Sequence, residues 1–405
     1  PYLLGLWERL GAPTDSLEHL TKRANHAASA EALQTLKDKF ALRWALSSFE
    51  DEIGFDALGK FQSRFADATV NAALRLAWAE TAKRFNLKSP DPRGLFLLGL
   101  GKLGGDDLNF SSDIDLIAFY DSGVLPVPES LGQNYVVNHC LKSLTQILFP
   151  RNAPHHIWRV DWRLRPESSG SGLALSTSKA EKFYFFRALP WHRLALMKAR
   201  VIAGDKEVGD TFLESLAPFI WRQNLDFRAL DDLAELKSRI NTEHPGLAQE
   251  RRSPAPITDD AKGFNLKLGA GGIREIEFLA NARQLVWGGK QAELQTTNTR
   301  AALQELAELN HLSQEEADIL RAHYATLRQI ENTVQILRNE QAHKIPEAEE
   351  DLEAVLALLE YSDMSELDME ILAIRTYVNE RFKKLFQAEA SSPRTPLADY
   401  KIELS

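Results

Sequence analysis

The chain has 405 residues, 44% of them hydrophobic, which is enough apolar material for two or three structural units and argues against disorder. Its formal net charge is -9, whereas a nonspecific nucleic-acid-binding protein would carry a basic footprint. The sequence shows neither a signal peptide nor an apolar run of about 18 residues, so we expect neither secretion nor a membrane span.

The single cysteine, Cys140, lies in an apolar helical pattern. We interpret it as a buried structural thiol in a reducing compartment rather than as a reactive nucleophile. Together with the missing signal peptide, this predicts a cytoplasmic protein. The chain begins with Pro1 rather than Met, which we interpret as the mark of an excised fragment.

The first region, residues 1–90, is expected to be helical. Its apolar residues recur at three- and four-residue spacing, for example at Leu33, Leu36 and Phe40. The two prolines in Ser89-Pro90-Asp91-Pro92 end this pattern.

An α/β region over residues 91–205 follows. Its expected strands are Leu95–Leu100, Ile114–Tyr120, Ile157–Arg165 and Gly172–Leu175, with a helix over Leu131–Leu148 between the second and the third. Helical periodicity returns over residues 206–390, and residues 391–405 resemble a linker to a missing second half.

The junction between the first two strands carries the most informative motif. A Gly-rich turn is predicted over residues 99–105, and the second strand opens with Ser112, Asp113 and Asp115. Because successive side chains of a strand alternate, the two carboxylates share one face. Such a pair beside turn N–H groups suits a divalent metal and a phosphate together, as nucleotidyl transfer requires. The turn is not a Walker A loop, because Lys102 precedes the glycines.

The third expected strand adds a carboxylate and two arginines. Its polar residues occupy odd positions, so that alternation places Asp161, Arg163 and Arg165 on one face. If this strand adjoins the second one, three carboxylates converge and could hold two metal ions for an in-line phosphoryl displacement. The arginines would bind phosphate oxygens. Taken alone, Asp161 would be interpreted as part of a solvated or ion-paired sheet face. Because the Gly-rich turn and the pair Asp113 and Asp115 are also present, we interpret Asp161 as part of the metal site.

Four sequence blocks carry a family resemblance. They are Gly-Lys-Leu-Gly-Gly at 101–105 with Leu108–Leu116, Val160–Pro166, Met197–Arg200 with Gly204-Asp205, and Lys267–Phe278. Together they resemble the bifunctional glutamine synthetase adenylyltransferase/adenylyl-removing enzymes of bacteria, over residues 15 to 390. The resemblance implies an α+β, predominantly helical fold, with a polymerase-β-like nucleotidyltransferase core, flanking helices and a C-terminal helical bundle.

The family enzymes carry two nucleotidyltransferase units, of which one is present here. Asn109 and Ser111 match the signature of the N-terminal, adenylyl-removing unit, and the block around Ile273-Arg274-Glu275 resembles the same unit. The resemblance therefore implies phosphorolysis, in which inorganic phosphate attacks the adenylyl phosphorus and yields ADP and free tyrosine.

Site roles follow from the motifs and the resemblance together. Asp113, Asp115 and Asp161 would bind two Mg²⁺ or Mn²⁺ ions, and Gly104, Gly105 and Ser112 would cradle the transferred phosphate. The repulsion between two anions would be offset by the cations Lys102, Arg163, Arg165, Lys198 and Arg200. Two interpretations of Lys198 and Arg200 remain open. They lie either on an extended segment that faces the site or at a helix end, where positive charge is favourable.

The implied partners are adenylylated glutamine synthetase, a PII signalling protein, and phosphate with ADP as product; neither nucleic acid nor a membrane is expected. Two alternatives remain, forward adenylyl transfer from ATP and a regulatory module that senses PII or glutamine. A PII-uridylylating enzyme is disfavoured by the Gly-Lys-Leu-Gly-Gly block. The chain departs from the family pattern at Asp107, Glu167-Ser168 and His192, and none of these departures affects the three aspartates.

Overall fold

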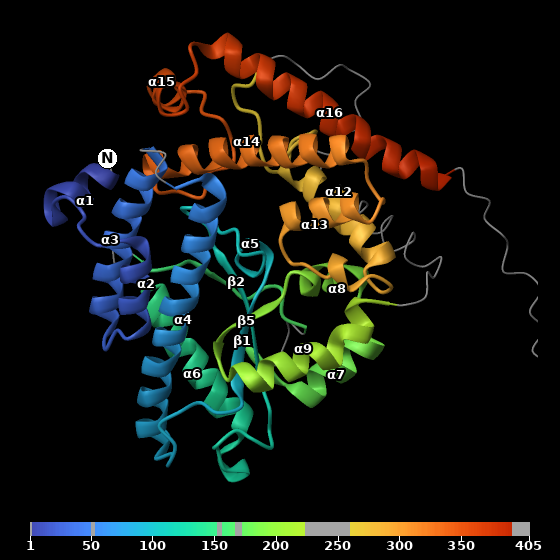
Figure 1. The fold of residues 1–405 in the computed structure, drawn as a ribbon. Coiled ribbons are helices and arrows are strands. Elements are labelled where there is room, and N and C mark those ends of the chain that lie inside the picture. Colours follow the sequence, from blue (N-terminus) through green and yellow to red (C-terminus); the bar gives the residue numbers. More distant parts are fainter. Residues whose placement is uncertain (1, 50–52, 152–155, 167–171, 223–259, 391–405) are drawn as a thin grey trace, which may run out of the picture.

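The computed structural model describes residues 2–49, 53–151, 156–166, 172–222 and 260–390 (Figure 1). The expected linker over 391–405 and the family departure at Glu167-Ser168 lie outside these residues. Helices dominate and surround one small sheet, which confirms the predicted α+β, predominantly helical class. None of the described helices combines the length and the apolarity that a membrane crossing requires.

The N-terminal region is helical, as its periodicity predicts. It contains α1 (Tyr2–Leu10), α2 (Leu17–Asn25), α3 (Ala30–Phe49) and α4 (Phe55–Phe85). Ser16 caps α2 by accepting a hydrogen bond from the His19 N–H, at 3.2 Å. The long helix α4 packs against α2, α6 (Gln133–Leu148) and the sheet, so these helices and one face of the sheet share a single hydrophobic core.

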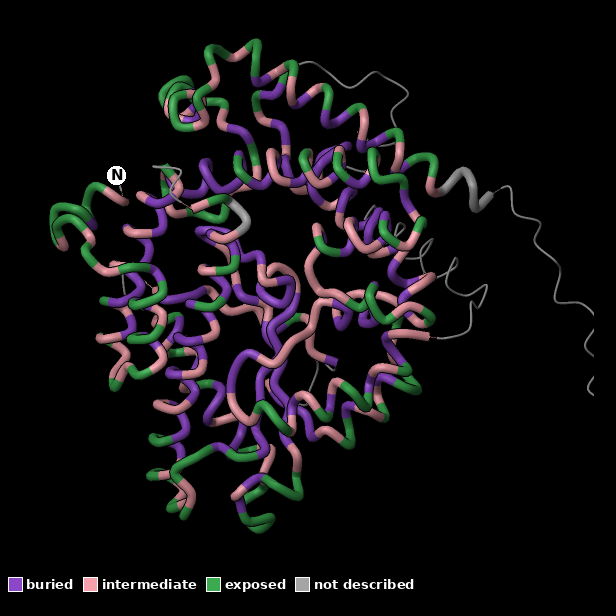
Figure 2. The backbone as a smooth tube through the Cα atoms, viewed as in Figure 1, coloured by how far each residue is buried: buried purple, intermediate pink, exposed green. Residues whose placement is uncertain are grey.

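The sheet has five short strands. They are β1 (Leu95–Gly99), β2 (Ile114–Tyr120), β3 (Val160–Asp161), β4 (Ala174–Ser176) and β5 (Arg200–Gly204). The order is β3-β2-β1-β5, and β4 also pairs with β2. Strand β1 runs antiparallel to β2 and β5, whereas β3 and β4 run parallel to β2. All five residues of β1 are buried, because helices cover both faces of the sheet (Figure 2).

The third strand is much shorter than its alternation predicts. Pairing with β2 begins at Val160 and ends at Asp161, where the predicted strand ran from Ile157 to Arg165. The cause lies in Asp161 itself, whose carboxylate accepts a hydrogen bond from the Arg163 N–H at 2.8 Å. An Asp that binds the backbone two residues ahead forms a turn and ends the strand. The prediction that Arg163 and Arg165 belong to this strand is therefore wrong.

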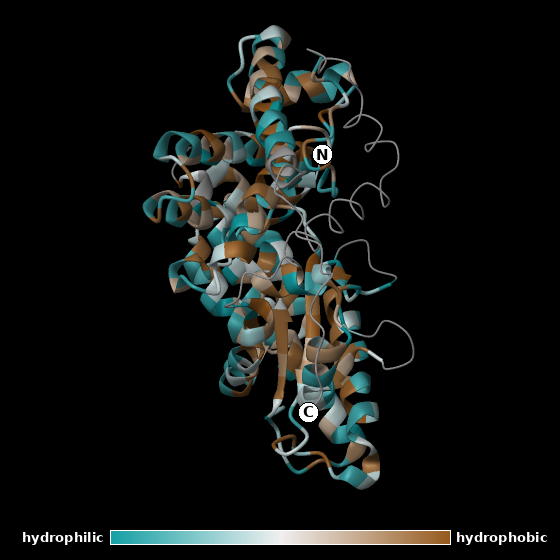
Figure 3. Cartoon of the chain, turned by 90° about the vertical axis from the view of Figure 1, so that its right-hand side faces the viewer, coloured by the Kyte–Doolittle hydropathy of each residue, from teal (hydrophilic) through white to brown (hydrophobic). Residues whose placement is uncertain are grey.

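The second face of the sheet is covered by α7 (Thr177–Phe186), α8 (Pro190–Met197) and α9 (Lys206–Ile220). Aromatic rings build much of this layer: Phe119 lies 4.8 Å from Phe212 and 5.9 Å from Phe96, between ring centroids. The strands are among the most hydrophobic segments of the chain (Figure 3). Burial on both faces explains why they form near-continuous apolar runs in the sequence.

The C-terminal region is helical. It contains α12 (Ile273–Trp287), the 3-10 turn η2 (Ala292–Leu294), α13 (Thr299–Glu308), α14 (Gln314–Arg338), α15 (Glu349–Leu358) and α16 (Met364–Ala390). These helices bury a core of their own, which includes Leu303, Leu320 and Ile374. Helix α14 belongs to this bundle and also contacts the short helix α5 (Gly101–Gly104) that follows β1, through the ion pair between Glu331 and Lys102 (Figure 1).

One glycine makes the junction after β1 possible. A Cβ on Gly104 would lie 1.7 Å from the Lys198 carbonyl oxygen and 2.6 Å from that of Gly99, and both are backbone atoms that cannot move aside. We expect Gly104→Ala to lower the free energy of unfolding by about 2–3 kcal/mol, measured by urea titration. The exposed Gly5→Ala is the control, because nothing lies within 4 Å of its added methyl group. Equal stability of the two variants would contradict this packing.

Candidate active site

The Gly-rich turn folds as the one-turn helix α5 and lies against Asp115. Gly101 has a φ of +55°, and a Cβ there would lie 2.6 Å from an Asp115 carboxylate oxygen. The N–H groups of Gly104 and Gly105 donate to the carbonyls of Leu100, at 2.9 Å, and Gly101, at 3.0 Å. The structure thus commits these two N–H groups to the helical turn, so they are not available as the predicted phosphate cradle.

Three aspartates lie on or directly before two adjacent strands. Asp115 of β2 is the direct register partner of Asp161 on the parallel strand β3, and Asp113 lies two residues before Asp115. The sequence analysis expected the carboxylates to converge if the third strand adjoined the second, and β3 does pair with β2. Ser112 lies beside them, half-buried, with its hydroxyl donating to the Asp113 carbonyl at 2.9 Å.

The three carboxylates have different electrostatic surroundings. Arg159 Nε lies 2.7 Å from Asp113, and Arg163 binds both oxygens of Asp161 at 2.5 to 3.0 Å. Burial raises the pKa of Asp161, but the hydrogen bonds from Arg163 more than offset it and hold this pKa below its usual value. Within the described residues, Asp115 has neither a hydrogen bond nor an ion pair to its carboxylate.

Among the three aspartates, Asp115 is therefore the one whose negative charge is not balanced by a directly bound arginine. Burial raises its pKa to about 6, the negative charges of Asp161 and Asp113 add to the rise, and Lys267 opposes it. A cation placed beside Asp115 would relieve both the burial and the like-charge repulsion.

The donor set fits a hard divalent ion, because carboxylate oxygens are the ligands that Mg²⁺ and Mn²⁺ prefer. Among the described residues, no three Asp, Glu, His or Cys side chains already form a ready-made metal cage. Arg159 and Arg163 form ion pairs with two of the three carboxylates, Asp113 and Asp161. The side chain of Arg163 is 87% exposed, so turning it away from Asp161 costs little.

The remaining predicted cations are held by distant elements. Lys102 Nζ lies 2.7 Å from Glu331 of α14. Lys198 ends α8 and contacts Glu277 at 3.4 Å and Thr299 Oγ1 at 2.9 Å, and this place favours the helix-end alternative.

Arg200 opens β5 and forms two hydrogen bonds to Asp67 of α4, at 2.5 and 2.9 Å. Arg165 donates to the carbonyl of Trp162 at 2.7 Å. The structure does not bring Lys102, Lys198 or Arg200 into hydrogen bonds with the three aspartates, and it gives each an anchoring contact instead.

Two site residues escaped the sequence analysis. Arg159 was visible as the first polar residue of the alternating stretch, but its pairing with Asp113 requires the strand register. Lys267 precedes α12, and its charge lowers the pKa of Asp115 although the two residues are far apart in the sequence. The sequence feature that could have indicated Lys267 is its position as the first residue of the 267–278 block, which carries part of the family resemblance.

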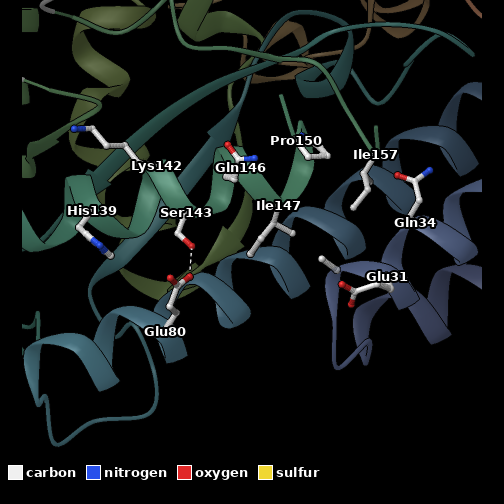
Figure 4. A pocket seen from close by; sticks show the side chains of 11 residues that line it. Glu31, Gln34, Glu80, His139, Lys142, Ser143, Gln146, Ile147, Pro150 and Ile157 are labelled. Carbon is white, nitrogen blue, oxygen red and sulfur yellow. Dashed lines mark hydrogen bonds between the residues drawn. The ribbon is translucent and has the colours of Figure 1, made fainter. Parts of the chain in front are cut away.

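An open groove of about 690 Å³ lies away from this site, between α3, α4 and α6 (Figure 4). Glu31, Glu80, His139 and Lys142 contribute to its lining, and Ser143 donates a hydrogen bond to Glu80. It contains none of the predicted site residues, so the aspartates on the sheet edge remain the candidate active site.

Comparisons with known proteins agree with this site. A family model described as glutamate-ammonia ligase adenylyltransferase matches residues 7–215, and one described as GlnD PII-uridylyltransferase matches residues 234–386. Curated proteins named bifunctional glutamine synthetase adenylyltransferase/adenylyl-removing enzyme are similar along most of the chain. The one from Caulobacter vibrioides is 36% identical over 389 residues, 94% of this chain and 38% of that protein.

Two further relatives have the same name. The protein from Rhodopseudomonas palustris is 34% identical over 405 residues, which cover 96% of this chain and 40% of the relative. The protein from Bartonella quintana is 34% identical over 371 residues, 90% of this chain and 37% of the relative. The chain thus spans about 40% of the length of the curated relatives it matches.

The two family matches divide the chain at the end of the α/β region. The first covers more than half of the 405 residues and contains the whole sheet with Asp113, Asp115 and Asp161, whereas the second covers mainly helices. The carboxylates that would perform nucleotidyl transfer therefore lie in the adenylyltransferase match. The chain belongs to the glutamate-ammonia ligase adenylyltransferase family, a family of nucleotidyltransferases.

Proposed function

We propose that this chain removes AMP from an adenylylated tyrosine of glutamine synthetase by metal-dependent phosphorolysis. The observation that carries the proposal is the carboxylate of Asp115, which is half-buried, lies in register with Asp161 and has no hydrogen bond or ion pair among the residues that the structure describes. Such a set suits a reaction between two anions in the presence of divalent metal. The direction rests on the resemblance of Asn109, Ser111 and the 267–278 block to the adenylyl-removing unit.

Asp113, Asp115 and Asp161 would hold two Mg²⁺ or Mn²⁺ ions. When bound, these ions supply positive charge to the reacting phosphates and to the oxygen of the leaving tyrosine. The inorganic phosphate is anionic at neutral pH, so the site needs no strong general base. The proton that completes the reaction goes to the phenolate that leaves.

The arginines and Lys267 are the side chains that would bind the phosphates once metal occupies the site. Arg163 binds Asp161 now, and it becomes available as a planar double donor when that carboxylate takes part in metal binding. Lys267 already acts electrostatically on Asp115 and forms no ion pair with the described residues. Both provide electrostatic stabilisation without a chemical step of their own.

The partners belong to the same proposal. The relatives' names refer to glutamine synthetase, and we extend that substrate to this chain. We also propose a PII signalling protein as a regulator and the bacterial cytoplasm as the location. Residues 1–90, 91–205 and 206–390 would be three regions of the chain.

The test incubates the purified chain with adenylylated glutamine synthetase, Mg²⁺ and phosphate, and measures ADP by chromatography. We expect ADP only when phosphate is present, and none with Asp113→Asn, which removes one of the three aspartates. If AMP were instead incorporated from ATP into unmodified synthetase, forward transfer would replace this proposal. If neither reaction occurred, with or without PII protein, a sensing module would replace it.

A further inference from the structure

Helix α14 of the C-terminal region is bound to the loop that leads into the active site. Five of its side chains face residues 102–111, at positions that repeat every three or four residues and so share one face of the helix. These are Tyr324, Arg328, Glu331, Asn332 and Gln335. Four of the five, all except Tyr324, carry amide or charged groups, and all five are nearly or fully buried.

Glu331 is the centre of these contacts. One carboxylate oxygen accepts from Lys102 Nζ at 2.7 Å and from Asn109 Nδ2 at 2.6 Å, and the other lies 2.6 Å from His343 Nδ1. The Glu331 side chain is 0% exposed. Burial alone would raise its pKa, but Lys102, His343 and Arg328 hold that pKa well below the usual value. Glu331 is thus a fixed negative charge inside the protein.

Neighbouring side chains fix the backbone of the same loop. Asn332 accepts from the Phe110 N–H at 2.8 Å, and Gln335 accepts from the Ser111 N–H at 3.1 Å. These backbone groups are buried and would otherwise lack a partner, which is costly. Helix α14 therefore supplies hydrogen bonds that the loop does not make for itself.

Two short routes lead from α14 to the aspartates. Glu331 holds Lys102, and the adjacent Gly101 lies so near Asp115 that a Cβ added to this glycine would be 2.6 Å from the Asp115 carboxylate. Gln335 holds Ser111, whose carbonyl and hydroxyl oxygens accept from Arg159, and Arg159 in turn binds Asp113. The second route consists of hydrogen bonds throughout.

A buried ionic network is a poor source of net stability, because apolar residues of similar volume are often at least as stabilising. What such a network provides is one defined register between two elements. Here the two elements are a helix of the C-terminal region and the loop that carries the first metal-binding aspartate.

We propose that Glu331 is a positioning residue for the three-aspartate site, so that the C-terminal helical region is an integral part of the active site. Glu331 touches neither substrate nor metal. It acts through Lys102 on the position of Asp115, and its hydrogen bond from Asn109 holds the same loop, while Gln335 acts through Ser111 and Arg159 on Asp113. The inference rests on the metal site of the proposed function, but not on the direction of the reaction.

The test measures the affinity for Mn²⁺ alone, by electron paramagnetic resonance, in the whole chain and its variants. We expect Glu331→Gln to weaken Mn²⁺ binding on the order of tenfold, since residues that orient metal ligands typically have effects of this size. Gln335→Met is the second variant, because it removes one hydrogen bond to the loop and no charge; we expect the same direction. If Glu331→Gln fails to fold, the Mn²⁺ affinity of Gln335→Met still tests the inference.

Leu320→Ala is the matched control. Leu320 lies on the same helix, fully buried in the C-terminal core, and its truncation destabilises the protein without a contact to residues 101–111. We expect its Mn²⁺ affinity to equal that of the parent, which a purely structural role of α14 would not explain. Equal affinity in all four proteins, or equal weakening in Leu320→Ala and Glu331→Gln, would overturn the inference.

The same experiment separates this inference from the proposed function. A parent chain that binds no Mn²⁺ would contradict the metal site and, with it, the positioning role. A parent that binds Mn²⁺ more tightly than Glu331→Gln but releases no ADP would support the positioning role and contradict the proposed reaction.

Discussion

Replacing Asp115 with Asn is expected to lower the rate of ADP formation at least about 1000-fold, because several kcal/mol of charge stabilisation depend on metal held at this carboxylate. The same change should make the metal-free protein more stable at about pH 8, by on the order of 1–3 kcal/mol, since it removes a half-buried charge that lies beside two other carboxylates. Opposite effects on activity and on stability are typical of a residue kept for function.

The pH dependence follows from the direction of the shift. The pKa of Asp115 is raised from 3.8 to about 6 in the folded chain, so the folded state holds its proton to higher pH than the unfolded state does. Ionisation of Asp115 therefore lowers stability as the pH rises from about 4 to 6, and the loss persists above that range. Parent and Asp115→Asn should have similar unfolding free energies near pH 4 and differ at pH 8.

The measurement is urea unfolding of both proteins across this pH range, with Asp210→Asn as the control. Asp210 forms an exposed pair with Lys206 on α9, and its replacement should change neither activity nor the pH profile. Asp115→Asn that is less stable than the parent at pH 8 would contradict the electrostatic account of the site.

Replacing Arg328 with Met is expected to lower the free energy of unfolding by about 3–5 kcal/mol, the usual cost of breaking a buried ion pair. Arg328 is 0% exposed and donates to the Asp107 carboxylate and backbone carbonyl, both at 2.6 Å, and to the side chain of Asn109. Without the guanidinium, the carboxylate of Asp107 keeps only the hydroxyl of Tyr324, at 3.1 Å, among these partners.

An exposed pair on the same helix is the control for this prediction. Arg338 binds Asp351 with two short contacts, but its side chain is 60% exposed. Arg338→Met should therefore cost far less than Arg328→Met, because surface ion pairs are weakened by solvent. Comparable losses in guanidinium chloride unfolding would show that the contact between α14 and the loop is not a determinant of stability.

The parts of the site that were predictable from sequence are those that depend on local rules. Alternation predicts that Asp113 and Asp115 share one face, and Asp161 lies next to Asp115 because β2 pairs with β3, which was a condition of the prediction. The extent of β3 was not predicted, because the side chain of Asp161 captures the Arg163 N–H and ends the strand. This hydrogen bond depends on the side-chain rotamer of Asp161, which the pattern of apolar residues does not predict.

The partners of the predicted cations depend on contacts between distant segments. Lys102 has a carboxylate partner 229 positions away, in α14, and Arg200 has one 133 positions away, in α4. Nothing in the spacing around Lys102 or Arg200 indicates these pairs, since they arise from the packing of helices on the sheet. The role of the Gly-rich turn changed for a similar reason, because its N–H groups are used inside α5.

The most direct test of the proposed phosphorolysis supplies isotopically labelled inorganic phosphate to the chain with adenylylated glutamine synthetase and Mg²⁺. We expect the label to appear in the β-phosphate of ADP, in an amount equal to the unmodified tyrosine formed, and Asp115→Asn to abolish this labelling. Release of unlabelled AMP, or label that stays in inorganic phosphate while AMP is transferred from ATP to the synthetase, would contradict it.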